Sequence, residues 1–207
     1  LSLLKGLPAG IDKGLAAWLP AVPYAAWPYI DPDILYTAAL IGFSELLRSG
    51  CTTCADHHYL YDDRDPSEFE DALFTAARET GIRFVLARGG ATTTGSHTGM
   101  RGAGIRGETL DTWLTRLTET VDARHDPSPY AMTRVALAPT SLVHSVTADD
   151  LALLAEFARE HGLRMHSHLK EVARDDEIAR ERHGLNALEY ADSVGWTGPD
   201  VWFAHLV

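Results

Sequence analysis

Hydrophobic positions along this chain follow two patterns, helical spacing and short continuous apolar runs. Between Pro32 and Ser49 apolar residues recur every three or four positions, and Gly50 follows as a C-terminal stop, which predicts a helix. Short apolar runs without alternation are typical of strands that are buried on both faces. We expect strands at residues 51–56, 83–88, 134–139, 164–168 and 200–207, and helices at 32–49, 67–80, 110–123 and 147–161.

The connecting segments differ in character. Residues 57–61 follow the first strand as a polar and aromatic loop. Residues 89–107 are rich in Gly, Thr and Ser and have no periodicity, which predicts a long loop of the kind used for binding or as a lid. Residues 175–190 carry further helix or turn, interrupted at Gly184.

Strands that alternate with helices predict an α/β fold with a parallel sheet covered on both faces. The sheet could be open and doubly wound or closed into a TIM-type (β/α)8 barrel. No G-x-G-x-x-G follows any of the expected strands, so the usual nucleotide-binding signal of the open form is missing. Polar residues stand instead at or just after the strand ends, which is where a barrel carries its active site: Asp56, His57, His58, Arg88, Ser141, His168, Glu171 and His205. The barrel is therefore the preferred interpretation.

Composition narrows the class of protein. The 207 residues, 45% hydrophobic and 23% charged, are typical of one soluble globular domain. A formal net charge of −11 disfavours nucleic acid as a partner, because phosphates would be repelled. No apolar stretch approaches the length of a membrane span, and no signal-peptide pattern opens the chain. We expect a cytoplasmic protein that does not bind membranes.

The two cysteines, Cys51 and Cys54, form a C-x-x-C that could mark a redox pair or half of a zinc site. No second cysteine pair completes a structural zinc site. Both thiols also lie in an expected strand, where small apolar side chains pack well. A packing role is the preferred interpretation.

The run His166-Ser-His168-Leu-Lys-Glu171 concentrates chemistry at one strand end. His166 and His168 point the same way, because side chains in a strand repeat with period two. Imidazole is a good ligand for zinc or iron, and Glu171 stands close enough to move a proton without binding the metal. The alternative is that the two histidines and a solvated glutamate have no catalytic or metal-binding role. His205, at the end of the next strand, adds weight because adjacent strand ends place it beside Glu171.

The order of these motifs resembles the amidohydrolase superfamily, in its cytosine and guanine deaminase and chlorohydrolase branch. The Asp56-His-His-Tyr-Leu-Tyr61 version is similar to the members that act on 8-oxoguanine and hydroxylated triazines. The matching stretches span nearly the whole chain: Glu45–Thr53 with Asp56, Arg88-Gly, Ala138–Ser141, His166–Glu171, and Gly195-Trp196 with Val201–His205.

The resemblance implies a role for each polar residue. His168 would be a ligand of one divalent metal, zinc or alternatively iron. Glu171 would be the proton shuttle, and His205 would orient the water or the forming oxyanion. His166 is as easily structural. Trp18, Trp27, Tyr59, Arg88 and Ser141 are candidate substrate contacts, together with His166.

The sequence also departs from the family pattern. The first-strand H-x-H and the last-strand aspartate of the family have no counterpart in this chain. We therefore interpret the chain as an incomplete barrel domain, about strands two to six, with residues 1–30 as the loop after the first strand and 31–207 as βα units. Such an arc would have two open sheet edges, which favours poor solubility or homo-oligomers.

Three functions follow from this interpretation. The leading one is metal-dependent hydrolytic deamination of a small purine-like or triazine-like heterocycle. A dechlorinating or amide-cleaving hydrolase is the alternative within the family, because the same activated water can attack other electron-poor carbons. The non-enzyme alternative is an inactive barrel fragment with an incomplete metal site.

Overall fold

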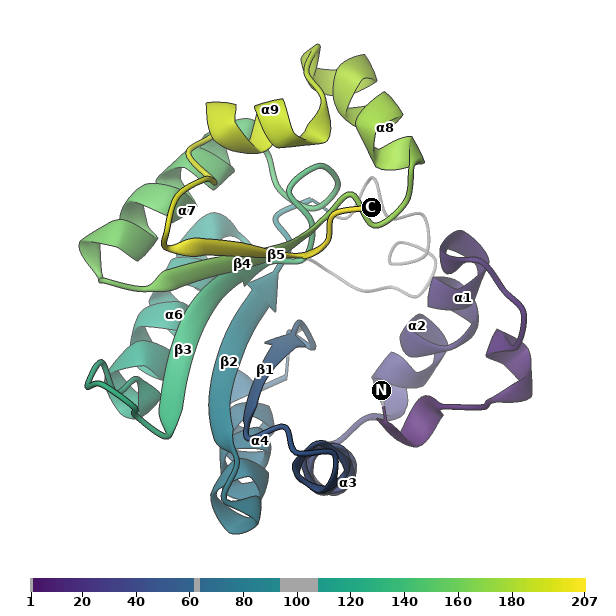
Figure 1. Cartoon of the computed structure of the whole chain (residues 1–207), viewed down its shortest axis with the longest axis vertical. Helices are drawn as coiled ribbons and strands as arrows, with labels where there is room; N and C mark the ends of the chain where they lie inside the picture. The colour runs from purple at the N-terminus through teal and green to yellow at the C-terminus, as the bar shows by residue number, and fades with distance from the viewer. Residues whose placement is uncertain (1, 62–63, 94–107) are drawn as a thin grey trace.

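In the computed structural model, which describes residues 2–61, 64–93 and 108–207, five parallel strands form one sheet in the order β1-β2-β3-β4-β5 (Figure 1). Each strand pairs in parallel with its neighbour in the sequence. The strands are β1 Thr53–His58, β2 Arg83–Gly90, β3 Thr133–Pro139, β4 Arg164–Leu169 and β5 Val201–His205. The expected α/β fold is confirmed, as a half-barrel of five strands.

One helix precedes β1, others follow the strands, and together they cover one face of the sheet (Figure 1). They are α3 Pro32–Arg48, α4 Pro66–Thr80, α6 Leu110–Arg124, α7 Ala148–Glu160, α8 Arg174–His183 and α9 Ala187–Ser193. The core lies between the helices and the sheet. Phe84 of β2 illustrates it, since its ring lies 5.3 Å from that of Phe43 in α3 and 5.2 Å from that of Phe74 in α4.

Local signals in the sequence set the helix ends. Asp31 accepts a hydrogen bond from the Ile34 amide at 2.8 Å, which caps the start of α3. Asn186 and Glu189 form a reciprocal capping box at the start of α9. Gly184 ends α8 with φ 73°, a left-handed conformation that glycine adopts without a steric penalty. The expected interruption at this glycine is confirmed.

The first strand differs from its expected position. It begins at Thr53 rather than at residue 51 and continues through His57 and His58, which we expected in a loop. His58 still pairs with Arg88 of β2, so the ladder continues beyond the apolar run. Gly89 and Gly90 likewise belong to β2 rather than to the following loop, and residues 94–107 of that loop lie outside the described residues.

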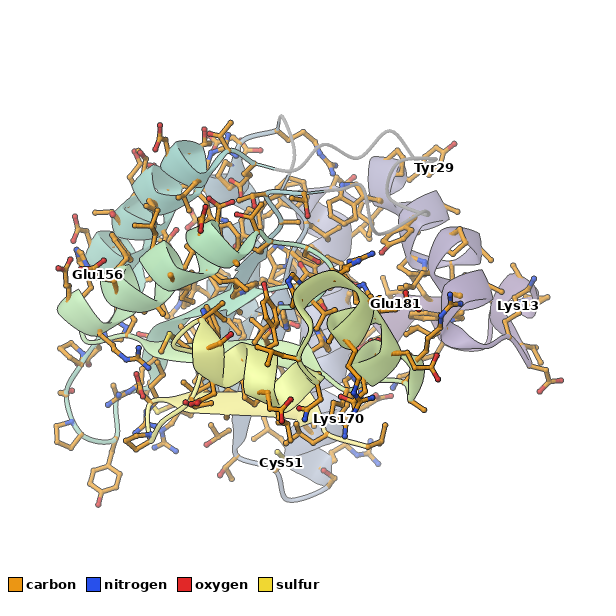
Figure 2. The ribbon with its side chains drawn as sticks, turned by 90° about the horizontal axis from the view of Figure 1, so that it is seen from above. Lys13, Tyr29, Cys51, Glu156, Lys170 and Glu181 are labelled. Atoms are coloured by element: carbon orange, nitrogen blue, oxygen red, sulfur yellow. The ribbon has the colours of Figure 1, made fainter. Side chains whose placement is uncertain are left out.

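Residues before α3, which we expected to form a loop, contain short helices: η1 Ser2–Leu4, η2 Pro8–Gly10, α1 Leu15–Ala21, α2 Pro23–Ala26 and η3 Trp27–Tyr29. Figure 2 shows this segment, marked by Lys13 and Tyr29, on the opposite side of the molecule from α7 with Glu156. Tyr24 and Trp27 are buried in a second, smaller apolar cluster. Among the described residues, no helix is long and apolar enough to cross a membrane.

Candidate active site

Three histidines from β1 and β4 meet on the concave face of the half-barrel. The ring of His57 in β1 lies 4.4 Å from that of His168 and 5.1 Å from that of His166, both in β4. Strand alternation places His166 and His168 on one face, as expected. The curvature of the sheet brings β1 close to them. The sequence placed His57 at a strand end but assigned it no role in the site, although the alternation that points Tyr59 inward also points His57 inward.

Each of these histidines binds one backbone carbonyl. His168 donates from Nδ1 to the Thr140 carbonyl at 2.8 Å, and His166 donates from Nδ1 to the Trp202 carbonyl at 3.1 Å. His57 donates from Nε2 to the Ala138 carbonyl at 3.0 Å. A carbonyl can only accept, so each contact fixes the ring as the tautomer that carries its proton there. In the neutral form of each ring, the other nitrogen therefore carries the lone pair.

Burial keeps two of these rings neutral. It lowers the pKa of His57 well below its ordinary value, with a further contribution from the charges of His168 and His166. Burial also lowers the pKa of His166 to about 4. A metal ligand must be unprotonated, so both rings are in the form that binding requires. Among the described residues, Nδ1 of His57 is a buried nitrogen without a hydrogen-bond partner.

Glu171 and His205 lie together at the carboxyl edge of the sheet. Nε2 of His205 is 3.5 Å from a carboxylate oxygen of Glu171, which confirms the expected juxtaposition. The His205 ring also stacks on His168, with centroids 5.3 Å apart. Lys170 and His205 both have left-handed backbones, with φ 53° and φ 78°. Such conformations are uncommon outside glycine and cluster at functional sites.

An aromatic wall borders the cluster on the side of β1. The Tyr59 ring is 6.0 Å from that of His57 and 5.9 Å from that of Trp27 in η3. Burial raises the pKa of Tyr59 to about 12, with smaller contributions from Asp56 and Glu171, so its hydroxyl stays protonated. Tyr59 thus links the N-terminal helices to the histidines.

Of two further candidates for substrate contact, Ser141 lies beside the histidine cluster and Trp18 lies within the N-terminal segment. Trp18 packs against Gly10, within the N-terminal segment itself. Ser141, half-buried after β3, forms an isolated parallel bridge with His168. Ser141 therefore lies at the edge of the histidine cluster, and its contact with substrate stays a prediction.

Arg88 has an environment different from the one expected. It follows Phe84 and Leu86 with period two in β2, so its side chain points toward the helices and away from the concave face. The guanidinium is fully buried, donates to both carboxylate oxygens of Glu108 at 2.5 and 2.8 Å, and lies 3.7 Å over the Tyr61 ring. A structural role replaces our interpretation of Arg88 as a substrate contact.

The described residues offer part of a metal site. Nδ1 of His168 is held by a carbonyl, which leaves Nε2 as the nitrogen that can bind a metal, the usual arrangement of a metal-binding histidine. His168 therefore fits a divalent metal. Within the described ranges, no group of three or more His, Cys, Asp or Glu side chains is placed to hold an ion.

Comparison with known proteins identifies the class. The model of the amidohydrolase family matches residues 3–207, so the chain belongs to this family. It is 42% identical over 206 residues to isoxanthopterin deaminase from an unknown prokaryotic organism, covering 100% of this chain and 43% of the relative. It is 35% identical over 198 residues to 8-oxoguanine deaminase of Pseudomonas aeruginosa, covering 94% of this chain and 42% of the relative.

A solved structure supports the same assignment. Atrazine chlorohydrolase from Arthrobacter aurescens TC1, complexed with zinc, superposes with a TM-score of 0.87 at 27% identity. The match covers 98% of this chain and 45% of that structure. The chain thus spans less than half the length of the relatives it matches, and its half-barrel corresponds to part of their fold.

Proposed function

We propose that this chain carries the proton-transfer half of an active site for metal-dependent hydrolytic deamination of an amino-substituted heterocycle. One observation carries the proposal: Glu171, His205 and His168 converge at the carboxyl edge of a half-barrel. The relatives support the substrate class. Isoxanthopterin and 8-oxoguanine, the compounds in their names, are both fused rings that bear an amino group and oxo groups.

Each residue has a separate task. When bound, a divalent metal would lower the pKa of a water molecule and so make it a stronger nucleophile toward the ring carbon. Glu171 accepts a proton from the attacking water and delivers it to the leaving nitrogen, so that water and the amino compound become the oxo compound and ammonia. His205, beside Glu171, either accepts a hydrogen bond from the attacking water and so orients it, or donates one to the forming oxyanion and so stabilises its charge.

Metal binding falls mainly to His168 among the residues of this chain. Its free Nε2 would be one ligand, and we infer that further ligands belong to barrel strands other than β1–β5. Zinc is the preferred metal because the matching chlorohydrolase structure is complexed with zinc; iron is the alternative. His166, Tyr59, Trp27 and Ser141 form the surroundings in which a flat ring would bind.

Dechlorination is a second candidate, favoured by the similarity to atrazine chlorohydrolase. The same proton transfers would serve either reaction, since only the leaving group differs. The two are distinguished by measuring ammonia released from isoxanthopterin and 8-oxoguanine against chloride released from atrazine, with zinc-supplemented protein. Ammonia release supports the deaminase, and chloride release supports the alternative.

The decisive variant is Glu171→Gln, which keeps the size of the side chain but cannot take a proton. We expect turnover to fall by a factor on the order of 100 or more. Glu177→Gln, on the exposed side of α8, is the matched control and should leave turnover unchanged. Equal activity of the two variants would refute the proton-shuttle role. Failure of the protein to bind zinc stoichiometrically, together with no release of ammonia or chloride, would favour the inactive fragment with an incomplete metal site.

A further inference from the structure

The turn that carries Glu171 is held by a buried carboxylate from the next helix. Asp175, in the first turn of α8, is largely buried. Its Oδ2 accepts hydrogen bonds from the backbone amides of Glu171 at 2.8 Å and of Val172 at 3.2 Å. The carboxylate thus reaches back over the chain that enters α8, as the acidic residue of a capping box does. It fixes the backbone from which the Glu171 side chain starts.

The other carboxylate oxygen of Asp175 contacts the segment that follows β3. Nε2 of His144, in the segment after β3, lies 3.1 Å from Oδ1 of Asp175. A second contact joins the same two segments, since Arg182 of α8 donates to the Val143 carbonyl at 2.9 Å. The segment after β3 is itself attached to the site, because Ser141 bridges to His168. Asp175 therefore connects the backbone of Glu171 to the segment that borders the metal-ligand candidate.

Charge favours this arrangement. Burial alone would raise the pKa of Asp175, but the His144 hydrogen bond and the two backbone amides outweigh it and lower the pKa below its ordinary value. The group is ionised at neutral pH and accepts three hydrogen bonds. Charge-assisted bonds of this kind are shorter and stronger than neutral ones.

We propose that Asp175, oriented by His144, is a positioning residue that sets the distance between Glu171 and His205. The catalytic part of this inference rests on the proposed function. The positioning of Glu171 rests on the geometry alone. The left-handed Lys170 precedes Glu171 directly, so the chain there lacks the support of a regular helix or strand. The carboxylate of Asp175 supplies that support. A shift of about 1 Å at a reacting group can cost on the order of 100-fold in rate.

The first test uses this chain and needs no activity. NMR signals of the His205 ring are compared before and after Glu171→Gln, in the parent and in Asp175→Ala and Asp175→Asn backgrounds. In the parent, removal of the carboxylate 3.5 Å away should shift these signals. The shift should be lost in Asp175→Ala and retained in Asp175→Asn, because the amide oxygen can still accept from the Glu171 backbone.

The matched control removes a similar capping contact from a helix away from the site. Glu189 reaches back to the Asn186 amide at 2.9 Å in α9, which is the same kind of contact away from the site. Glu189→Ala should leave the Glu171-dependent shift intact. His144→Phe should reduce the shift without abolishing it, since the two backbone amides keep Asp175 in place. An undiminished shift in the Asp175→Ala background would overturn the inference, whatever the enzyme assay shows.

Catalysis supplies the second test. With isoxanthopterin as the probe and zinc-loaded protein, Asp175→Ala should lower kcat by about tenfold or more and change KM little, because binding does not use Glu171. Asp175→Asn should recover most of kcat. If Glu171→Gln has no effect on turnover while the NMR result holds, the proposed function fails and the positioning survives. If KM rises and kcat is unchanged in Asp175→Ala, the positioning role fails.

Discussion

The imidazole of His57 stacks on that of His168, with ring centroids 4.4 Å apart and planes inclined by 18°. One ring belongs to the first strand of the sheet and the other to the fourth. The pair joins the two sides of the half-barrel across its concave face. Because His168 also donates to the Thr140 carbonyl, its ring is held both at its edge and over its face.

Removal of the His57 ring should loosen this support. We expect His57→Ala to weaken zinc binding by about 10- to 100-fold, as loss of the groups that orient a metal ligand commonly does. His57→Phe also loses the Ala138 contact but keeps a flat ring against His168, and should retain most of the affinity. Titration with zinc in competition with a chelator measures both. Equal affinities for the Ala and Phe variants would show that stacking is irrelevant.

Arg88 and Glu108 should matter for stability rather than for binding. Their ion pair is buried, with side-chain exposures of 0% and 5%. Arg88→Met leaves a buried carboxylate that, among the described residues, keeps its ion pair with Arg116, and the loss should cost about 3–5 kcal/mol in the free energy of unfolding. The double variant with Glu108→Leu should recover much of that loss. Urea denaturation gives both values.

An exposed ion pair is the control for this experiment. Lys5 and Glu45 lie 3.1 Å apart with most of each side chain in water. Glu45→Gln should leave the unfolding midpoint unchanged, because solvent screens such pairs. A midpoint for Arg88→Met as high as that of Glu45→Gln would contradict the structural role of Arg88.

Asp175 should make stability depend on acid pH. Its pKa is lower in the folded chain than the ordinary value of 3.8, so the folded state favours the ionised form. That contribution is present above the ordinary pKa and is lost as pH falls through the lower folded-state pKa. Asp175→Asn lacks it. The difference between the urea midpoints of parent and variant should therefore shrink as the solution is acidified, and a constant difference would argue against an ionised Asp175.

Tyr59 should act through its ring. Tyr59→Phe keeps the contacts with Trp27 and His57 and should leave KM for isoxanthopterin nearly unchanged. Tyr59→Ala removes the wall and should raise KM by about tenfold, the equivalent of ~1.4 kcal/mol. Steady-state kinetics on both variants provides the check. A rise in KM for Tyr59→Phe would mean instead that the hydroxyl itself contacts substrate.

Much of this architecture follows from local patterns in the sequence. The strand positions depend on apolar runs and glycine stops, and the approach of His205 to Glu171 follows from the adjacency of two parallel strand ends. The role of His57 could not be predicted, because it lies beyond the apolar run of β1 and its contacts depend on how far the sheet curves. Arg88 was misplaced for a simpler reason, since its period-two relation to Phe84 and Leu86 already pointed it toward the helices.

The support of Glu171 could not be predicted from patterns at all. Asp175 lies four residues further along and could have been any solvated acidic residue in the first turn of a helix. Its partner His144 lies thirty-one residues earlier in the chain, and both α7 and β4 lie between the two residues in the sequence. Such pairs become visible only when the helices are packed.

The sheet order has a consequence for how the chain is made. Because spatial order equals sequence order, each strand can dock on the one synthesised just before it, and the growing edge follows the ribosome from β1 to β5. The stack of His57 on His168 is different, since it joins positions 111 residues apart (168 − 57) and closes only after four strands have assembled. Docking of neighbouring strands from β1 to β4 therefore precedes the stacking of His57 on His168.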